Sequence, residues 1–150
     1  MSDNLLKLIP TQQEYAPNKD AQFAAQELLG RFVESEGEVL AYTTEQVEFV
    51  DAGANFENLS CPACGRSISG EWWSAAMSKA NESAFTNLNV VTPCCQTRTS
   101  LNDLNYNWAQ GFARFVLQVR NPGISTLDES VLNELETILG CKLRVVWVHL

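Results

Sequence analysis

The sequence predicts an α+β fold, in which a mainly antiparallel sheet carries helices packed on one face and a cysteine-containing element is inserted in the middle. Three observations support this prediction. The segments at both ends of the chain alternate strand, helix and strand, and two short cysteine turns occupy the centre. The chain has 150 residues, of which 45% are hydrophobic and 19% charged, which suits one packed domain. We therefore expect a single α+β domain over residues 1–150, with the insertion at about residues 55–105.

The N-terminal segment is expected to form a strand followed by a helix. The apolar run "LLKLI" at residues 5–9 is typical of a short strand, which Pro10 ends. In the segment 18–33, apolar residues recur at helical spacing, and Asn18 or Asp20 can cap the first turn.

The middle of the chain is expected to alternate short strands with one helix. "GEWWSAAMSKA" at residues 70–80 has the spacing of a short helix, and the Asn-rich stretch 102–111 is typical of a loop. "NFENLS" at residues 55–60 is expected to return beside "EQVEFV" at 45–50, after a turn. The predicted strands of this region are 45–50, 55–60, 88–91 and 97–101.

The last forty residues predict a strand, a helix and a final strand. Residues 113–120 alternate apolar and polar side chains, as a half-buried strand does. Thr126 and Glu129 fit a capping box, in which both side chains satisfy free amide groups at a helix start. Gly140 is the expected helix end, and residues 141–150 read as a strand. The apolar stripe of this helix is Val131, Leu132, Leu135, Ile138 and Leu139.

The two cysteine turns predict a metal site. Cys61 and Cys64 in "CPACG" have the C-x2-C spacing that points two sulfur atoms at one centre, and zinc prefers four such ligands in a tetrahedron. "TPCCQ" at residues 92–96 repeats this turn with two differences, because a threonine takes the first cysteine position and Cys94 fills the middle. We expect Cys61, Cys64, Cys94 and Cys95 to bind one Zn2+ ion.

The second turn leaves an alternative open. Adjacent residues on an extended chain point to opposite faces, so Cys94 and Cys95 can both be ligands only if the backbone folds sharply there. If one of them is not a ligand, Cys141 or His149 could complete the set, although their separation of roughly 26 Å along a strand prevents both from binding one ion. The more ordinary interpretation of Cys141 and His149 is a small core residue and a chain-end imidazole.

Four thiolates favour a structural metal over a catalytic one. A catalytic zinc keeps one coordination position open for water, and a closed all-cysteine site has none. The sequence therefore favours a protein that is not an enzyme. The alternative is an enzyme whose polar site lies beside the metal and uses Asp51, Glu57 and Asp103. Arg66 and Arg98 follow the two turns and could offset the negative charge of the site, or could be ordinary surface residues.

Aromatic residues offer a second pair of interpretations. Trp72, Trp73, Tyr106 and Trp108 could form an aromatic binding surface, because such side chains are enriched where proteins recognise partners. Packing in a core is the more ordinary interpretation.

The charge is concentrated in the first part of the chain and suggests a basic partner. Residues 1–60 hold 11 acids and 3 bases, a net charge of −8, whereas residues 61–150 hold 7 of each. Such a surface repels phosphate backbones and anionic lipids, so we expect neither nucleic acid nor membrane as a partner. We expect a cytoplasmic binding protein that engages a basic protein, and toxin-neutralising immunity proteins are one class of that size and charge. A solvated acidic face and a nucleic-acid-associated zinc module are the alternatives, and the sequence does not fix the oligomeric state.

The stretches "CPACG", "TPCCQTRTSLNDLNYNW" and "GFARFVLQVRNPG" resemble small bacterial proteins without an assigned function, over roughly residues 45–145. The cysteine motifs resemble zinc-ribbon or treble-clef knuckles, and that resemblance implies a structural zinc ion. Such knuckles usually carry C-x2-C twice, and this chain departs from the pattern at Thr92 and Cys94. The resemblance implies no reaction and no substrate.

Overall fold

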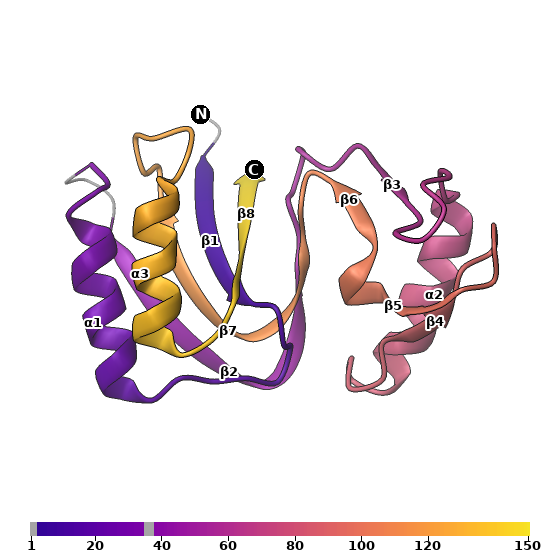
Figure 1. Cartoon of the computed structure of the whole chain (residues 1–150), viewed down its shortest axis with the longest axis horizontal. Coiled ribbons are helices and arrows are strands. Elements are labelled where there is room, and N and C mark those ends of the chain that lie inside the picture. Colours follow the sequence, from indigo (N-terminus) through magenta and orange to yellow (C-terminus); the bar gives the residue numbers. More distant parts are fainter. Residues whose placement is uncertain (1–2, 35–37) are drawn as a thin grey trace.

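A four-stranded sheet with two helices on one face forms one side of the molecule, and a smaller cysteine-containing element forms the other (Figure 1). The computed structural model describes residues 3–34 and 38–150. We call the four-stranded sheet with its two helices the sheet unit, and the cysteine-containing element, residues 51–110, the insertion. The sheet unit contains β1 (Asn4–Pro10), α1 (Lys19–Gly30), β2 (Val39–Val50), β7 (Gly111–Arg120), α3 (Glu129–Leu139) and β8 (Leu143–His149). The predicted α+β class is confirmed.

The strands of the sheet unit lie in the order β2-β7-β1-β8, and every neighbouring pair is antiparallel. Without the insertion, the elements follow the sequence β-α-β-β-α-β. This order of elements and strands is the ferredoxin-like, or split β-α-β, topology. The first and last strands of the chain, β1 and β8, thus lie side by side.

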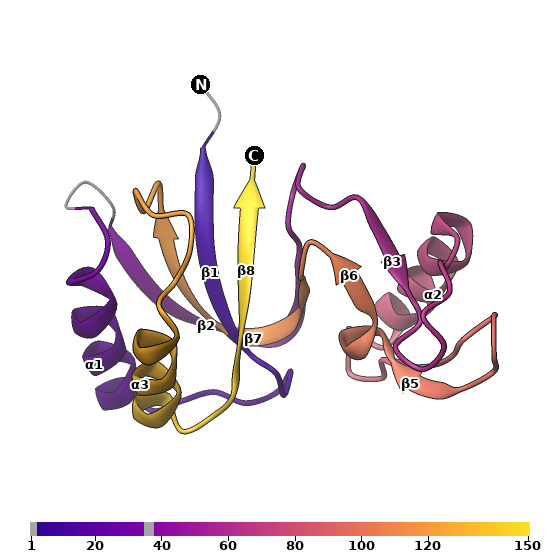
Figure 2. The same cartoon turned by 45° about the horizontal axis from the view of Figure 1, so that its top comes forward.

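Helices α1 and α3 lie next to each other on the same face of the sheet (Figure 2). Of the two predicted capping residues, Asn18 caps α1 by accepting a hydrogen bond from the Ala21 N–H at 2.8 Å, and Asp20 lies in the first turn. The predicted capping box at Thr126 is wrong, because Asp128 caps α3 and accepts from the Ser130 N–H at 3.1 Å. In the described parts of the chain, no helix has the length and apolar character that a membrane crossing requires.

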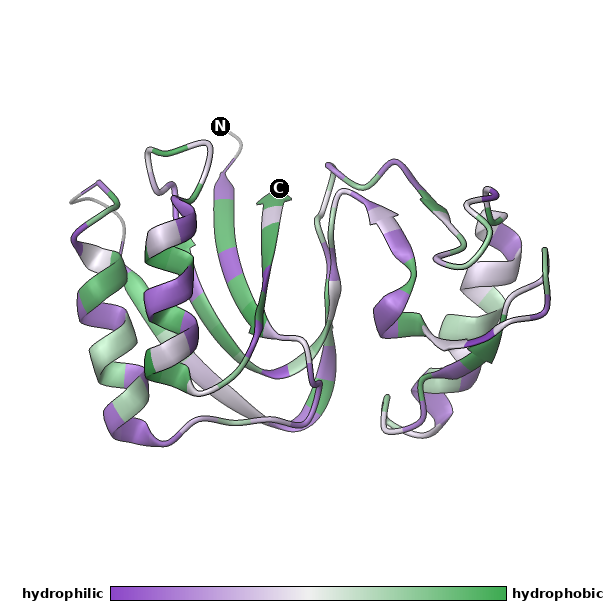
Figure 3. Ribbon diagram, viewed as in Figure 1, coloured by the Kyte–Doolittle hydropathy of each residue, from purple (hydrophilic) through white to green (hydrophobic). Residues whose placement is uncertain are grey.

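The main core fills the space between these helices and the sheet. The apolar stripes of α1 and α3 face inward (Figure 3), although α1 also carries Phe23 on its outer side, where that ring is 65% exposed. On the sheet, alternate residues of β1 and β7 point toward the helices, as the period of a strand requires. The fully or nearly fully buried members of this core include Leu6, Leu8, Ala25, Leu29, Phe115, Leu117, Val131, Leu135 and Leu139.

The opposite face of the sheet is also buried, although neither α1 nor α3 covers it. Its buried residues include Leu5, Ile9, Val116 and Val146. Strands β2 and β7 curve (Figure 1), and the chain beyond β2 returns to the edge of β8, where the Ala54 N–H donates to the His149 carbonyl at 2.7 Å. Gly53 makes this approach possible, because a Cβ atom there would lie 2.4 Å from the His149 oxygen. The sheet thus curls around its second apolar face.

The insertion has its own small core, built on two short ladders and one helix. β3 (Asn58–Ser60) pairs with β6 (Asn105–Asn107), and β4 (Asn89–Val91) pairs with β5 (Arg98–Ser100). The helix α2 and a single 3-10 turn, η1, complete the insertion; their bounds are Gly70–Glu82 and Leu101–Asp103. The side chains of Phe49 and Phe112, from the ends of β2 and β7, enter this core with ring centroids 5.1 Å apart.

Several predicted element boundaries are wrong. The helix predicted over 18–33 ends at Gly30, and the strand predicted over 45–50 begins at Val39. Residues 55–60 do not return beside β2, because β3 pairs with β6 instead. The predicted loop 102–111 contains η1 and β6, whose Asn-rich sequence carries little strand signal. Part of the acidic stretch "VESEGEV" lies at 35–37, outside the described residues.

A buried asparagine joins the insertion to the sheet unit. The Asn102 Oδ1 atom accepts hydrogen bonds from the Phe112 N–H at 3.0 Å and from Arg144 Nη1 at 2.8 Å, and its Nδ2 donates to the Thr11 carbonyl at 3.0 Å. Gly111 leaves room for these contacts, because a Cβ atom there would lie 2.4 Å from Arg144 Nη1. Burial lowers the pKa of Arg144, so its guanidinium depends on these partners.

Replacing Asn102 should therefore destabilise the whole chain. In Asn102→Ala, the buried Phe112 N–H loses its acceptor and Arg144 Nη1 keeps only the Gln110 carbonyl at 3.2 Å, so we expect a loss of about 2 kcal/mol or more in the free energy of unfolding. The measurement is equilibrium denaturation. Asn105→Ala, whose side chain is exposed, is the control and should change stability by less than about 0.5 kcal/mol. Equal stability of the two variants would show that the Asn102 contacts do not join the two parts.

Candidate metal centre

The first cysteine turn follows β3 directly and is closed by two main-chain hydrogen bonds. The Gly65 N–H donates to the Cys61 carbonyl at 2.9 Å, and the Cys61 N–H donates to the Arg66 carbonyl at 2.9 Å. Gly65 has φ +76°, a left-handed conformation that glycine adopts without a steric penalty. The turn therefore brings Cys61 and Cys64 to the same side.

The second turn, between β4 and β5, repeats this geometry. The Gln96 N–H donates to the Thr92 carbonyl at 3.0 Å, and the Thr92 N–H donates to the Thr97 carbonyl at 3.0 Å. Gln96 takes the glycine position with φ +58°. Thr92 thus occupies the structural position of Cys61, as the aligned sequences suggest.

The two turns bring four sulfur atoms together. The Sγ atoms of Cys61, Cys64, Cys94 and Cys95 all lie within 4.8 Å of one another. Cys61 Sγ is 3.6 Å from Cys95 Sγ, and Cys64 Sγ is 3.3 Å from Cys94 Sγ. A tetrahedron of sulfur atoms around zinc, with Zn–S bonds of about 2.3 Å, has edges of about 3.8 Å. The four cysteines therefore fit a metal ion such as zinc in both donor type and spacing.

Cys94 and Cys95 both point into the cluster because the chain folds sharply after Pro93, where residues 93–95 form a turn. Thr92 has a different role. Its buried side chain accepts a hydrogen bond from the Thr97 N–H at 3.0 Å, and its Oγ1 lies 3.4 Å from Cys95 Sγ. Thr92, which replaces the first cysteine of the turn, is thus not one of the four sulfur residues but contacts one of them, Cys95.

Hydrogen bonds prepare part of the cluster for the thiolate form. The hydroxyl groups of Thr92 and Thr97 lower the pKa of Cys95 to about 6, and the Thr97 Oγ1 lies 3.1 Å from that sulfur. The Cys64 N–H lowers the pKa of Cys61. At Cys64 the Arg66 N–H favours the thiolate, but the neighbouring sulfur of Cys94 and burial outweigh it and raise the pKa to about 11. A divalent cation would offset the effect of burial and of the neighbouring sulfur atoms on Cys64, since it stabilises every thiolate of the cluster at once.

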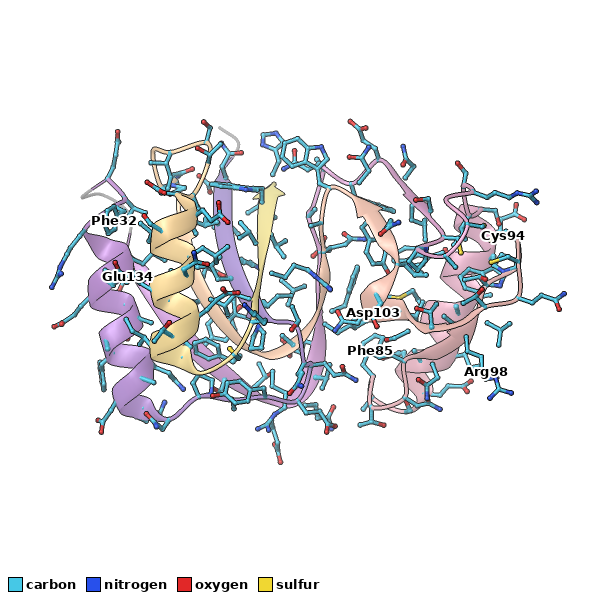
Figure 4. The ribbon with its side chains drawn as sticks, in the orientation of Figure 1. Phe32, Phe85, Cys94, Arg98, Asp103 and Glu134 are labelled. Carbon is cyan, nitrogen blue, oxygen red and sulfur yellow. The ribbon has the colours of Figure 1, made fainter. Side chains whose placement is uncertain are left out.

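The cluster lies at the border between the insertion's core and solvent. Cys61 is fully buried against the aromatic core, Cys94 is half-buried, and Cys64 and Cys95 are exposed. Figure 4 shows Cys94 at the end of the molecule that is remote from α1 and α3. Such a site can tie the two turns together, but it lies far from the main core.

Cys141 and His149 lie outside the cluster. Cys141 packs at the edge of the main core, and burial raises its pKa to about 11. His149 Nδ1 lies 2.8 Å from Asn4 Oδ1. In the described residues, the four other cysteines form the one group of three or more histidine, cysteine or carboxylate side chains that could bind a metal.

The carboxylates of the alternative enzyme site are exposed and engaged locally. Asp51 accepts from the Gly53 N–H at 3.2 Å, and Glu57 accepts from Asn107 Nδ2 at 3.5 Å. Asp103 is exposed at the end of η1. The structure therefore does not bring Asp51, Glu57 and Asp103 into one cluster with the sulfur atoms.

Most of the aromatic residues pack in the core of the insertion. The Trp73 Nε1–H donates to the Tyr106 hydroxyl at 3.1 Å, and the Tyr106 hydroxyl donates to the Leu101 carbonyl at 2.6 Å. Burial raises the pKa of Tyr106 to about 12. The core interpretation is confirmed for Trp73 and Tyr106, whereas Trp108 is 44% exposed.

Comparisons with known proteins give no family assignment: no protein-family model, curated protein or solved structure matches the chain. The resemblance to a bacterial protein group therefore stays a prediction. What the structure supports is the cysteine cluster, whose geometry is compatible with a zinc knuckle.

If Cys94 and Cys95 of the second turn both bind the metal, removal of either thiol should weaken zinc binding equally. We expect Cys94→Ser and Cys95→Ser to lower zinc affinity as much as Cys61→Ser does, because metal binding and local folding are coupled. Hydrogen exchange should show faster exchange over residues 55–105, with the sheet unit still protected.

Cys141→Ala is the matched control, because it removes a thiol outside the cluster. It should keep the metal and lose about 1 kcal/mol of stability or less. Parental zinc affinity and protection in Cys94→Ser would assign Cys94 as a bystander.

Proposed function

We propose that the protein is a non-catalytic binding protein whose insertion is stabilised by one structural Zn2+ ion, and whose acidic surface engages a basic partner protein. The observation that carries the zinc assignment is the group of four sulfur atoms within 4.8 Å, with no nitrogen or oxygen ligand in the group. Four thiolates close the coordination shell, so the ion would have no position for water or substrate. Its role would then be to fix the fold of the insertion.

The small size of its core explains why the insertion would use a metal. Residues 51–110 supply few fully buried side chains of their own, and the cluster lies where that core meets solvent. A metal that joins two turns adds folding energy where apolar burial is limited. The sheet unit, with apolar packing on both of its faces, has no such need.

Unpaired carboxylates support the proposal of a basic partner. The described residues contain two ion pairs, Arg120–Asp3 and Lys142–Glu136. The acids along β2 and the chain after it are exposed and belong to neither pair; they are Glu45, Glu48, Asp51 and Glu57. Exposed charge of one sign speeds encounter with a partner of the opposite sign. A cationic toxin neutralised by this protein is the partner class that we propose, by analogy of size and charge.

The purified protein should contain one zinc ion per chain, bound through sulfur alone. Elemental analysis gives the stoichiometry, and X-ray absorption gives the ligand atoms. Zinc should be released as the pH falls, because protons compete with the metal for thiolates. A metal-free protein, or a first shell rich in nitrogen or oxygen, would contradict the structural-zinc proposal and revive the enzyme alternative.

The partner proposal is tested with two charge-reversal variants. The first changes Glu45, Glu48 and Asp51 to Lys; the second changes Glu14, Glu27 and Glu134, which are exposed elsewhere on the sheet unit. Each replacement adds two charges, so both variants shift the net charge from −8 to −2.

For a partner isolated by chemical cross-linking, the association rate should fall at least about tenfold in the first variant and much less in the second. The partner should be basic, and raising the salt concentration should slow association. Equal effects of the two variants would show that total charge, and not this surface, determines binding. An acidic partner would overturn the proposal.

A further inference from the structure

A groove of about 1100 Å³ lies beside the metal centre, between α2 and the β4–β5 hairpin. One stripe of α2 forms its first wall, with Trp72, Ala75 and Lys79 at helical spacing. The hairpin forms the second wall, with Val91 and Arg98. The groove borders the core of the insertion, because Trp72, Ala76 and Leu101 belong to that core and also line the groove.

The size and openness of the groove favour a chain-like ligand. Pockets for small molecules usually enclose about 300–1,000 Å³. This groove is slightly larger than that range, and many of its lining residues are exposed, including Ala75, Lys79, Asn89 and Arg98. It therefore suits an extended segment that remains partly in solvent.

β4 offers an unpaired edge at this groove. In the part of the chain that the structure describes, β4 pairs with no strand other than β5, and on its outer edge the Asn89 N–H donates to Asn87 Oδ1 at 3.1 Å. Asn89, Val90 and Val91 of β4 all line the groove, as do Arg98 and Thr99 of β5, so the groove runs along the hairpin. Val91 is 51% exposed and provides an uncovered apolar contact. An open strand edge can pair with a peptide in extended conformation.

The charge of the groove is opposite to that of the rest of the protein. Two of the insertion's three bases, Lys79 and Arg98, line it, against one acid, Glu82. Both bases are exposed and belong to neither ion pair of the described residues. Figure 4 shows the Arg98 side chain at the outer side of the insertion. Two free cations beside an apolar wall match a segment that carries both carboxylate and aliphatic side chains.

We propose that this groove binds an extended acidic peptide segment of a partner protein, which adds a strand to β4 with its carboxylates near Lys79 and Arg98. Nucleic acid would present a similar charge. It is disfavoured because two cations are few for a phosphate chain, and the net charge of −8 repels it. The groove is distinct from the acidic surface proposed above for a basic partner, so either proposal can fail without the other.

The test is selection from a phage-displayed library of random peptides on the zinc-loaded full-length protein. We expect enriched peptides to be acidic, with aliphatic residues at alternate positions. Lys79→Glu/Arg98→Glu should weaken binding of a selected peptide by about tenfold or more. Lys19→Glu/Arg31→Glu is the matched control, because it makes the same charge change at exposed positions of the sheet unit and should leave binding unchanged.

A second variant, Val91→Ser, tests the apolar contact at the strand edge without changing the charge of the groove. It should also weaken binding, and peptide binding to the parent should slow amide exchange at residues 89–91. The zinc content of every variant is measured, so that a damaged metal site is not mistaken for a damaged groove.

Three results would overturn the proposal. These are enrichment of basic peptides or of none, equal loss of binding in the groove variant and its control, and binding without protection of residues 89–91. Tighter binding of a single-stranded oligonucleotide than of any selected peptide, abolished by Lys79→Glu/Arg98→Glu, would assign the groove to nucleic acid instead.

Discussion

The pairing of β2 with β7 is the constraint on which the rest of the structure depends. Val50 at the end of β2 lies opposite Gly111 at the start of β7, so the β2–β7 pairing alone makes the two ends of the insertion neighbours. The entropic cost of closing a loop grows slowly, by only about 0.6 kcal/mol for each doubling of its length. A segment as long as residues 51–110 can therefore leave and re-enter a ferredoxin-like sheet without changing its strand order. Because Phe49 and Phe112 continue from the paired strands into the aromatic core, the same ladder also positions the insertion.

Inside the insertion, the cysteine cluster is the second feature that brings distant parts of the chain together. The β3–β6 and β4–β5 ladders have three residue pairs each, and such short antiparallel elements are marginal by themselves. The cysteines lie at the turns, so a metal there would connect β3 to the β4–β5 hairpin on the side that the core leaves exposed. Asn102 connects the insertion to the sheet unit near the Val50–Gly111 end. The insertion is thus held at one end by buried hydrogen bonds and at the other by the sulfur cluster.

The sequence predicts the parts of this structure that depend on local signals. Helical spacing over 18–33 and 70–80 and the apolar stripe over 131–139 give three helices in the correct places, and turn residues with C-x2-C spacing give the sulfur cluster. The pairing of β3 with β6 is not predictable in this way, because it joins residues about 45 apart that carry weak strand propensity. The return of the chain after β2 to the edge of β8 is equally unpredictable from local signals, since it depends on close contact between Gly53 and His149. The support of Cys95 by Thr92 could have been found, because aligning the two turns places a hydroxyl where the first turn has a sulfur.

Thr92 also contributes to the way in which the negative charge of the cysteine cluster is balanced. Zinc with four thiolates carries a formal charge of −2, in a chain whose net charge is already −8. Arg66 and Arg98 follow the two turns, but Arg98 lies apart from Cys94 in Figure 4 and lines the groove. The groups that do contact the sulfur atoms are dipoles: hydroxyls of Thr92 and Thr97 at Cys95, and main-chain N–H groups at Cys61 and Cys64. Neutral donors of this kind stabilise thiolates without using a full positive charge. The site can therefore be balanced from within its own turns, and the two exposed bases of the groove remain free to contact a partner.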